Sequence, residues 1–200
     1  MKSELAQQIR QTALRQGAVL VGFTKIRKVE PVIVFAFPFS DTWFLKDPAK
    51  ISRLLGTTYK TSHHVQTLVA NILRFQGYWA RHKSVMSVYG DFRPLAVAAG
   101  LGEWGRNGII TNKRFGAGLL FAATFTNAPL PANRAVQQTQ THCKKCGQCI
   151  RSCPAKAFTP RGFSATRCLT YSLKGCAKCV NACSGLGSDP FSLESAHLRV

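Results

Sequence analysis

The eight cysteines are the residues of this chain whose spacing most directly predicts chemistry. All eight lie between positions 143 and 183, and no cysteine precedes Cys143. Four stand in the run CKKCGQCIRSCP, residues 143–154, separated by two, two and three residues and followed by a proline. Cys168 then stands alone before a second group, CAKCVNAC, residues 176–183. So many thiols within so short a segment predict a shared function for them.

Three kinds of cysteine chemistry are compatible with such a group. Disulfides are rare in the cytoplasm, where we expect this chain because it has no signal-peptide-like apolar run at its start and no segment of about 18 apolar residues. Zinc modules usually use two separated C-x2-C pairs. The spacing C-x2-C-x2-C-x3-C-P is instead the run that holds [4Fe–4S] clusters in bacterial ferredoxins. The pattern therefore favours iron–sulfur clusters over zinc, and zinc over disulfides.

Crossed ligation, as in two-cluster ferredoxins, gives each of two [4Fe–4S] clusters four thiolates and leaves no cysteine over. The first set of ligands would be Cys143, Cys146, Cys149 and Cys183, and the second set would be Cys153, Cys168, Cys176 and Cys179. The eight ligands follow from the residue types, whereas their division is an inference from chain geometry. Two fully ligated clusters carry electrons, so the reaction they serve must occur elsewhere in the chain.

The part of the chain from 1 to 127 is predicted to form a layered domain of the α/β (α+β) class. An N-terminal helix is indicated by Leu5, Ile9 and Ala13, which recur on one helical face. Strands are predicted at residues 18–23, 32–37, 85–89 and 118–126, and a helix at 61–81. Residues 128–142, with two prolines and a polar tail, read as a linker to a cluster domain at 143–200.

The segment PLAVAAGLGEWGRNGIITNKRFGAG, within residues 94–118, is dense in glycine. Glycines allow positive φ angles or the close approach of a large flat ligand, but they also serve in tight structural turns, and glycine content alone decides neither way. The segment does not match the dinucleotide-binding fingerprint or the P-loop.

This segment resembles the glycine-rich segment of corrinoid-dependent reductive dehalogenases and of epoxyqueuosine reductase, a tRNA-modifying enzyme. RCLTYSL before CAKCVNAC, ALRQGAVLVGFTKI and VIVFAFPFS resemble further segments of epoxyqueuosine reductase. The resemblance implies a nitroreductase-like domain that holds cobalamin, followed by a ferredoxin-like domain whose two clusters reduce the cobalt. It also implies that the glycine-rich loop borders the corrinoid, and the cofactor-binding candidates are Gly100, Gly102, Gly105, Arg106, Asn107 and Gly108.

The resemblance also suggests two candidate proton donors. Asp91, in YGDFRP just before the glycine-rich segment, is the nearest candidate for the carboxylic acid that epoxyqueuosine reductase uses, although a turn or capping aspartate before Pro94 is the simpler interpretation. Tyr59 matches the residue type of a dehalogenase proton donor, but it also fits an ordinary surface tyrosine. His63 resembles a histidine that opens the equivalent helix in the family, and a polar helix start is the alternative.

Charge adds a prediction about partners. The formal net charge is +19, and from Trp104 to Ser188 there are twelve Lys or Arg and no Asp or Glu. Such a field attracts an acidic electron donor such as ferredoxin or flavodoxin, or a polyanion such as tRNA.

The cysteines, the resemblance and the charge together leave three hypotheses for the function. They are an iron–sulfur reductase with a bound corrinoid, a non-enzymatic electron carrier or corrinoid-reducing accessory protein, and a basic cluster-containing nucleic-acid-binding protein.

Overall fold

A four-stranded antiparallel sheet in the order β1-β2-β6-β3 forms the centre of the N-terminal part of the chain, which we call the body. The computed structural model describes residues 2–26, 30–38, 48–83, 91–133, 141–160 and 162–183. The elements of the body are α1 (Lys2–Arg15), β1 (Leu20–Ile26), β2 (Glu30–Pro38), α2 (Pro48–Phe75), β3 (Ala80–Lys83), α3 (Arg93–Ala98), β4 (Glu103–Trp104), β5 (Ile110–Thr111) and β6 (Leu119–Thr126).

The position of β2 inside the sheet, between β1 and β6, explains why its sequence is a continuous apolar run. Successive side chains of a strand point to opposite faces of the sheet. Ile33, Phe35 and Phe37 belong to one core cluster, and Val32, Val34 and Ala36 belong to another. Both faces of the sheet are therefore buried, and alternation between apolar and polar residues disappears.

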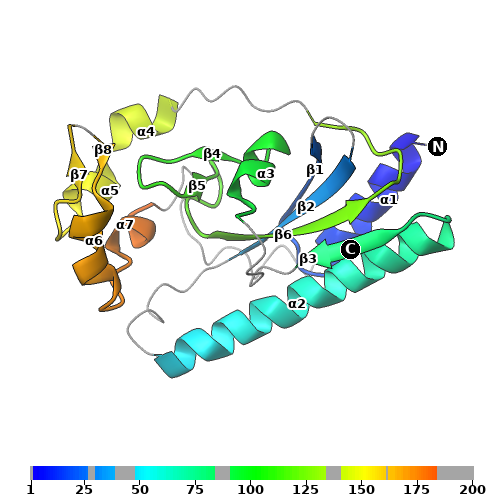
Figure 1. Ribbon diagram of the computed structural model, residues 1–200, viewed down its shortest axis with the longest axis horizontal. Coiled ribbons are helices and arrows are strands. Elements are labelled where there is room, and N and C mark those ends of the chain that lie inside the picture. The colour runs from blue at the N-terminus through cyan, green and yellow to red at the C-terminus, as the bar shows by residue number, and fades with distance from the viewer. Residues whose placement is uncertain are drawn as a thin grey trace.

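Helices α1 and α2 cover one face of the sheet, and α3 with the β4–β5 hairpin covers the other (Figure 1). The predicted face of α1 is confirmed, because Leu5, Ile9 and Ala13 are all buried in the first cluster. Val65 and Val69 of α2 lie in the same cluster. The mixed α/β class predicted from the sequence is thus confirmed as a three-layer arrangement.

The helix predicted at 61–81 is wrong at both ends. The observed helix begins earlier, at Pro48. It ends at Phe75, because Gly77 takes a left-handed φ of +81° and the Tyr78 N–H donates to the Leu73 carbonyl at 2.9 Å. A left-handed glycine just past the last turn is a common helix stop. Residues 80–83 leave the helix and pair with β6 as an edge strand.

The other predicted strands have mixed outcomes. The structure confirms the strands predicted at 18–23, 32–37 and 118–126 with small shifts, as β1, β2 and β6. The strand predicted at 85–89 lies outside the described residues. The start of the predicted linker packs on the core, since Ala128 and Leu130 are buried and Asn133 N–H donates to the Phe23 carbonyl at 2.8 Å.

The cysteine-rich segment, residues 141–183, consists of short elements gathered at one end of the molecule, beside the β4–β5 hairpin (Figure 1). They are α4 (Thr141–Cys146), α5 (Gln148–Arg151), β7 (Phe158–Thr159), β8 (Gly162–Phe163), α6 (Ala165–Ser172) and α7 (Lys178–Asn181). No helix in the described part of the chain is long and apolar enough to cross a membrane.

Candidate iron–sulfur site

The first predicted set of cysteines surrounds a cavity. Cys143, Cys146, Cys149 and Cys183 all line it, and it is partly open, so that its empty space of about 330 Å³ includes solvent outside it. The chain reaches this geometry through very short helices, because Gly147 takes a left-handed φ of 62° and separates α4 from α5. Three thiols from the start of the segment thus share the cavity with the last cysteine of the chain.

The second predicted set is grouped around Cys179. The pKa of the Cys179 thiol is raised to about 11, chiefly by burial and in addition by the neighbouring cysteines Cys168, Cys149, Cys153 and Cys176. A raised pKa keeps the thiol protonated, so binding of a metal or cluster must displace its proton. Three of these four neighbours are the other members of the second set, and Cys149 belongs to the first.

The pKa of the Cys183 thiol is likewise affected by the other cysteines of the first set. Burial raises its pKa, and the nearby Cys143, Cys149 and Cys146 contribute further. All eight cysteines are half-buried and free of disulfide bonds. Within the residues that the structure describes, no three His, Cys, Asp or Glu side chains are close enough together to hold a single metal ion.

The glycine-rich segment forms the opposite wall of the cysteine cavity. Arg106, Asn107 and Thr111 line the cavity together with the first set of cysteines. Asn107 is buried, and its Nδ2 donates to the Cys179 carbonyl at 3.5 Å, while the Ala117 N–H donates to the Cys183 carbonyl at 3.1 Å. Two segments that lie far apart in the sequence are thereby joined at the cavity.

Close packing and turn geometry explain several glycines of this segment. A Cβ on Gly102 would lie 2.6 Å from the Thr111 carbonyl oxygen, and one on Gly105 would lie 2.7 Å from the Asn107 Oδ1. Both contacts are too close for a real side chain, so the fold of the β4–β5 hairpin itself requires these two glycines. Gly108 has open space but a left-handed φ of +74°, and Gly100 is also left-handed, with a φ of 72°. Packing and turn geometry therefore account for the glycine content without a ligand.

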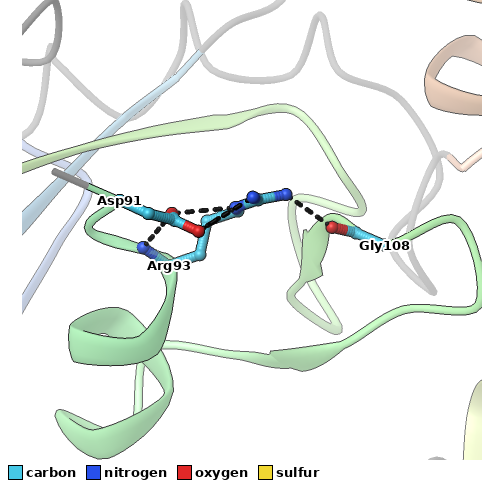
Figure 2. A network of polar contacts seen from close by, with 3 residues as sticks. All are labelled: Asp91, Arg93 and Gly108. Carbon is cyan, nitrogen blue, oxygen red and sulfur yellow. Dashed lines mark hydrogen bonds and ion pairs between the residues drawn. The ribbon is translucent and has the colours of Figure 1, made fainter. Parts of the chain in front are cut away.

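Asp91 is held by an arginine two residues further on (Figure 2). Arg93 Nε donates to Asp91 Oδ1 at 2.8 Å and to Oδ2 at 2.9 Å, and the Arg93 backbone N–H donates to Oδ1 at 2.9 Å. Arg93 Nη1 also donates to the Gly108 carbonyl at 2.8 Å, and its guanidinium lies 5.3 Å from the Trp104 ring centroid. The pair thus fastens the start of α3 to the hairpin.

These contacts determine the acidity of Asp91. The hydrogen bonds from Arg93 hold the pKa of the Asp91 carboxyl below its ordinary value. A carboxyl that stays ionised at neutral pH is a poor proton donor. The structure thus favours the turn interpretation of Asp91, since its Oδ1 accepts from the Arg93 N–H while Phe92 is the N-cap of α3, and its catalytic role stays a prediction.

Tyr59 belongs to a ring cluster at the junction of α2 and β3. The Tyr59 ring stacks on His63 with centroids 6.1 Å apart, and His63 meets His82 edge to face at 5.2 Å. Among the described residues, two buried polar atoms of α2 and β3, Gln66 Oε1 and His82 Nδ1, have no hydrogen-bond partner. His82 and Gln66 carried no motif in the sequence, so only the pairing of β3 with β6 reveals them.

The two candidate proton donors are not brought together. Tyr59 lies on α2, which packs on one face of the sheet, whereas Asp91 precedes α3, which packs on the other. Each candidate must therefore be judged separately. Tyr59 is 42% exposed, whereas both carboxylate oxygens of Asp91 are engaged by Arg93.

Comparison with known proteins finds homologues of two kinds. The chain is 30% identical over 171 residues to an epoxyqueuosine reductase of Vibrio cholerae, covering 81% of this chain and 43% of that protein. It is 31% identical over 137 residues to a tetrachloroethene reductive dehalogenase of Dehalobacter restrictus, covering 66% of this chain and 24% of that protein. The chain thus spans less than half the length of either relative. No family model matches it.

Solved structures of both kinds share the fold. A catabolic reductive dehalogenase in complex with 3-bromo-4-hydroxybenzoic acid superimposes with a TM-score of 0.72 at 18% identity, over 96% of this chain and 34% of that one. An epoxyqueuosine reductase with a tRNA stem loop superimposes with a TM-score of 0.68 at 16% identity, over 95% and 68%. The class is therefore an α/β protein homologous to reductases. The particular relatives are epoxyqueuosine reductases and reductive dehalogenases, as the sequence resemblance predicted.

Proposed function

We propose that this protein is an iron–sulfur oxidoreductase in which two [4Fe–4S] clusters deliver electrons to the α/β body for reductive chemistry. The proposal divides the chain as the sequence suggested, into a nitroreductase-like domain at 1–127, a linker at 128–142 and a ferredoxin-like domain at 143–200. The observation that carries it is the cavity that the first set of cysteines lines together with the glycine-rich segment.

The residues around the cavity suit a cluster. A cubane binds its four thiolates through different irons, so the ligands need to surround a space rather than converge on one ion. A bound cluster would supply one-electron transfer. Ala157 N–H points at Cys153 Sγ at 3.5 Å, and backbone donors to sulfur are one of the means by which proteins tune cluster potentials.

The direction of electron flow follows from the contacts. The first set of cysteines lines the cavity with Arg106 and Asn107 of the body, whereas the second set meets the body at the Cys179 carbonyl, which accepts from Asn107, and includes Cys168 on the exposed helix α6. Electrons would enter at the second cluster and leave from the first into the body at the glycine-rich segment.

A corrinoid is the acceptor that the relatives suggest, since a related reductive dehalogenase structure concerns B12-dependent dehalogenation. When bound, it would supply a strongly reducing cobalt centre. The residues proposed to border it are Gly100, Gly102, Gly105, Arg106, Asn107 and Gly108, although packing already explains most of the glycines. Arg106 is exposed at the cavity rim and is the residue best able to contact a polar substituent. Tyr59 and Asp91 are the two candidate proton donors, and Asp91 is the one beside the glycine-rich segment, because Arg93, which holds it, also donates to the Gly108 carbonyl.

Anaerobic reconstitution tests the proposal. The protein is incubated with iron, sulfide and hydroxocobalamin, desalted, and examined by metal analysis, visible absorption and electron paramagnetic resonance under dithionite. We expect about eight irons per chain, reduced-cluster signals and a retained corrinoid with its lower base detached. Zinc in place of iron would overturn the cluster assignment. Arg106→Gln is the variant for the corrinoid, because Gly102→Val would disrupt the hairpin whether or not a ligand binds there.

An electron carrier or corrinoid-reducing accessory protein is the second candidate function. It is favoured by the positions of the two candidate proton donors, since neither Tyr59 nor Asp91 lines the cysteine cavity. Two reduced clusters with no retained corrinoid would support it.

Nucleic-acid binding is a third candidate, because one structural neighbour holds a tRNA stem loop and the segment from Trp104 to Ser188 contains no acidic residue. Binding of a tRNA stem loop, measured between about 50 and about 200 mM salt, would test it, since phosphate contacts produce a steep loss of affinity across that range.

A further inference from the structure

We propose that α6 and the turn after it form a docking surface for an acidic electron-donor protein, which delivers electrons to the cluster of the second cysteine set. The inference rests on the proposed function and adds the place and the chemistry of the partner. The surface is defined as Phe163, Arg167, Leu169, Tyr171, Leu173 and Lys174.

The apolar part of this surface is unusual within the molecule. Of the eight large apolar or aromatic side chains that are exposed in the described residues, four lie within residues 163–173. Leu173 is 79% exposed and Leu169 is 54% exposed, and their i, i+4 spacing places them on one side of the helical turn. The other four exposed side chains are scattered over α1, α2 and the turn after α2. Clustered apolar side chains on a surface indicate an interaction site, whereas single ones need no explanation.

Helix α6 makes little use of its side chains within the chain. None of its residues is buried, although its N-terminus is capped by Ser164, whose hydroxyl accepts from the Arg167 N–H at 3.5 Å. Its one predicted ligand is Cys168, which is half-buried. A helix that gives one side to a thiol and leaves leucines on another is suited to contact a partner.

The charge around the leucines determines what kind of partner fits. Arg167 on α6 and Lys174 in the turn after it are exposed, and Lys156 and Lys178 are exposed on the neighbouring elements. Arg167 Nη1 donates to the Lys156 carbonyl at 3.3 Å, an uncharged acceptor that does not neutralise the guanidinium. No residue between Trp104 and Ser188 is acidic. A complementary partner therefore carries acidic side chains around an apolar patch.

A protein partner fits this surface better than RNA does. Phosphate and base recognition uses cations and stacking aromatic rings, which this surface also has, but its two most exposed apolar side chains are the aliphatic Leu173 and Leu169, which contribute little to either. Protein interfaces combine apolar and charged side chains, and this short helix exposes leucines as well as Arg167, with Lys174 directly after Leu173.

The location suits electron entry. Leu169 directly follows Cys168, and α6 lies at the far end of the molecule from α1, beyond the hairpin of the body (Figure 1). In the transfer step, the reduced donor loses one electron and the oxidised second cluster gains it, and no bond or proton moves.

The test measures cluster reduction in the reconstituted protein by stopped flow, with a purified, fully reduced flavodoxin as the acidic donor. Leu173→Ser is expected to lower the second-order rate constant about tenfold, and Lys174→Glu to lower it about threefold at low salt, with a weaker salt dependence. Phe75→Ser, which alters a 94% exposed side chain on α2, and Lys25→Glu on β1 are the matched controls and should leave the rate unchanged. Dithionite should reduce the wild type and all four variants equally.

Each other outcome has a definite meaning. Equal rates for the variants and the wild type with flavodoxin would overturn the docking surface while leaving the clusters intact. An effect of Lys174→Glu without one of Leu173→Ser, together with competition by a tRNA stem loop, would replace it with a polyanion site. A dimer by sedimentation that Leu173→Ser converts to a monomer would make the surface a self-association interface. A wild type that dithionite cannot reduce would instead remove the proposed function, and the docking proposal with it.

Discussion

The sheet body and the cysteine-rich segment are stabilised in different ways. Buried residues of the body form two core clusters, which lie on opposite faces of the sheet. Among the described residues of 141–183, only Ala157 and Ala177 are buried, and both are small. A body with a dry core can fold through apolar burial, whereas a segment with two buried alanines needs another source of free energy. Metal–thiolate bonds supply that energy in small metal-dependent domains.

The largest predicted effect is loss of a cluster ligand. Cys149→Ser is expected to abolish the first cluster and to leave the 141–183 segment open to protease, because a segment without a core loses its main stabilising bonds. The body should keep its circular dichroism. Iron analysis and limited proteolysis measure the two effects. Ala182→Ser, at the same cavity, is the control, and its iron content should stay near that of the wild type. A Cys149→Ser protein with full iron content and a protected segment would contradict the comparison.

A core truncation in the body should be next in size. Phe35 is fully buried in the central strand, so Phe35→Ala is expected to lower the free energy of unfolding of the body by about 3–5 kcal/mol. Phe75→Ala removes the same atoms from a 94% exposed position and should change it by less than about 0.5 kcal/mol. Denaturant unfolding followed by circular dichroism measures both. Similar losses at the two positions would mean that the body does not depend on its core.

A smaller effect concerns acid stability at the α2–β3 junction. Burial lowers the pKa of His82, and the nearby positive charges of His63 and Arg74 lower it further. As pH falls, the unfolded chain therefore binds a proton at His82 before the folded protein does. The free energy of unfolding should then decrease as pH falls below about 6.5 and through the lower pKa that His82 has in the folded state. Melting temperatures between pH 7.5 and 5 test this. His82→Gln should flatten the dependence while His64→Gln, on the exposed side of α2, should not, and an unchanged slope in His82→Gln would refute the assignment.

The smallest effect is expected at the Asp91–Arg93 pair. Both side chains are nearly half exposed, so Arg93→Gln should cost only about 0.2–1 kcal/mol. Because the folded pKa of Asp91 is lowered, this contribution is present above the ordinary pKa of the carboxyl and disappears as pH falls through the folded value. Titration of the carboxyl by nuclear magnetic resonance should show its pKa rising in Arg93→Gln. Reductase activity that falls in Asp91→Asn far more than in Arg93→Gln would restore Asp91 as a proton donor.

The patterns that were predicted correctly are those that one local rule governs. VIVFAF read as a buried strand because a run of apolar side chains fills both faces of a sheet. The helix predicted at 61–81 is correct in kind, but the prediction runs past Gly77, whose left-handed φ ends the helix. An edge strand as short as β3 has too few residues for a period to appear, and only pairing with β6 defines it.

The sequence alone determined the eight thiols, their ferredoxin-like spacing, the basic charge and the relation to reductases, because residue type and spacing along the chain carry all of these. The tertiary structure decided which thiols share a cavity, that Asn107 faces the cysteines, that Arg93 holds Asp91, and that α6 leaves its leucines exposed. Each of these depends on contacts between residues that no local pattern relates, or on which elements cover a given face. Such contacts arise only when the whole chain has packed, since it is the sum of burial over the fold that brings distant segments together.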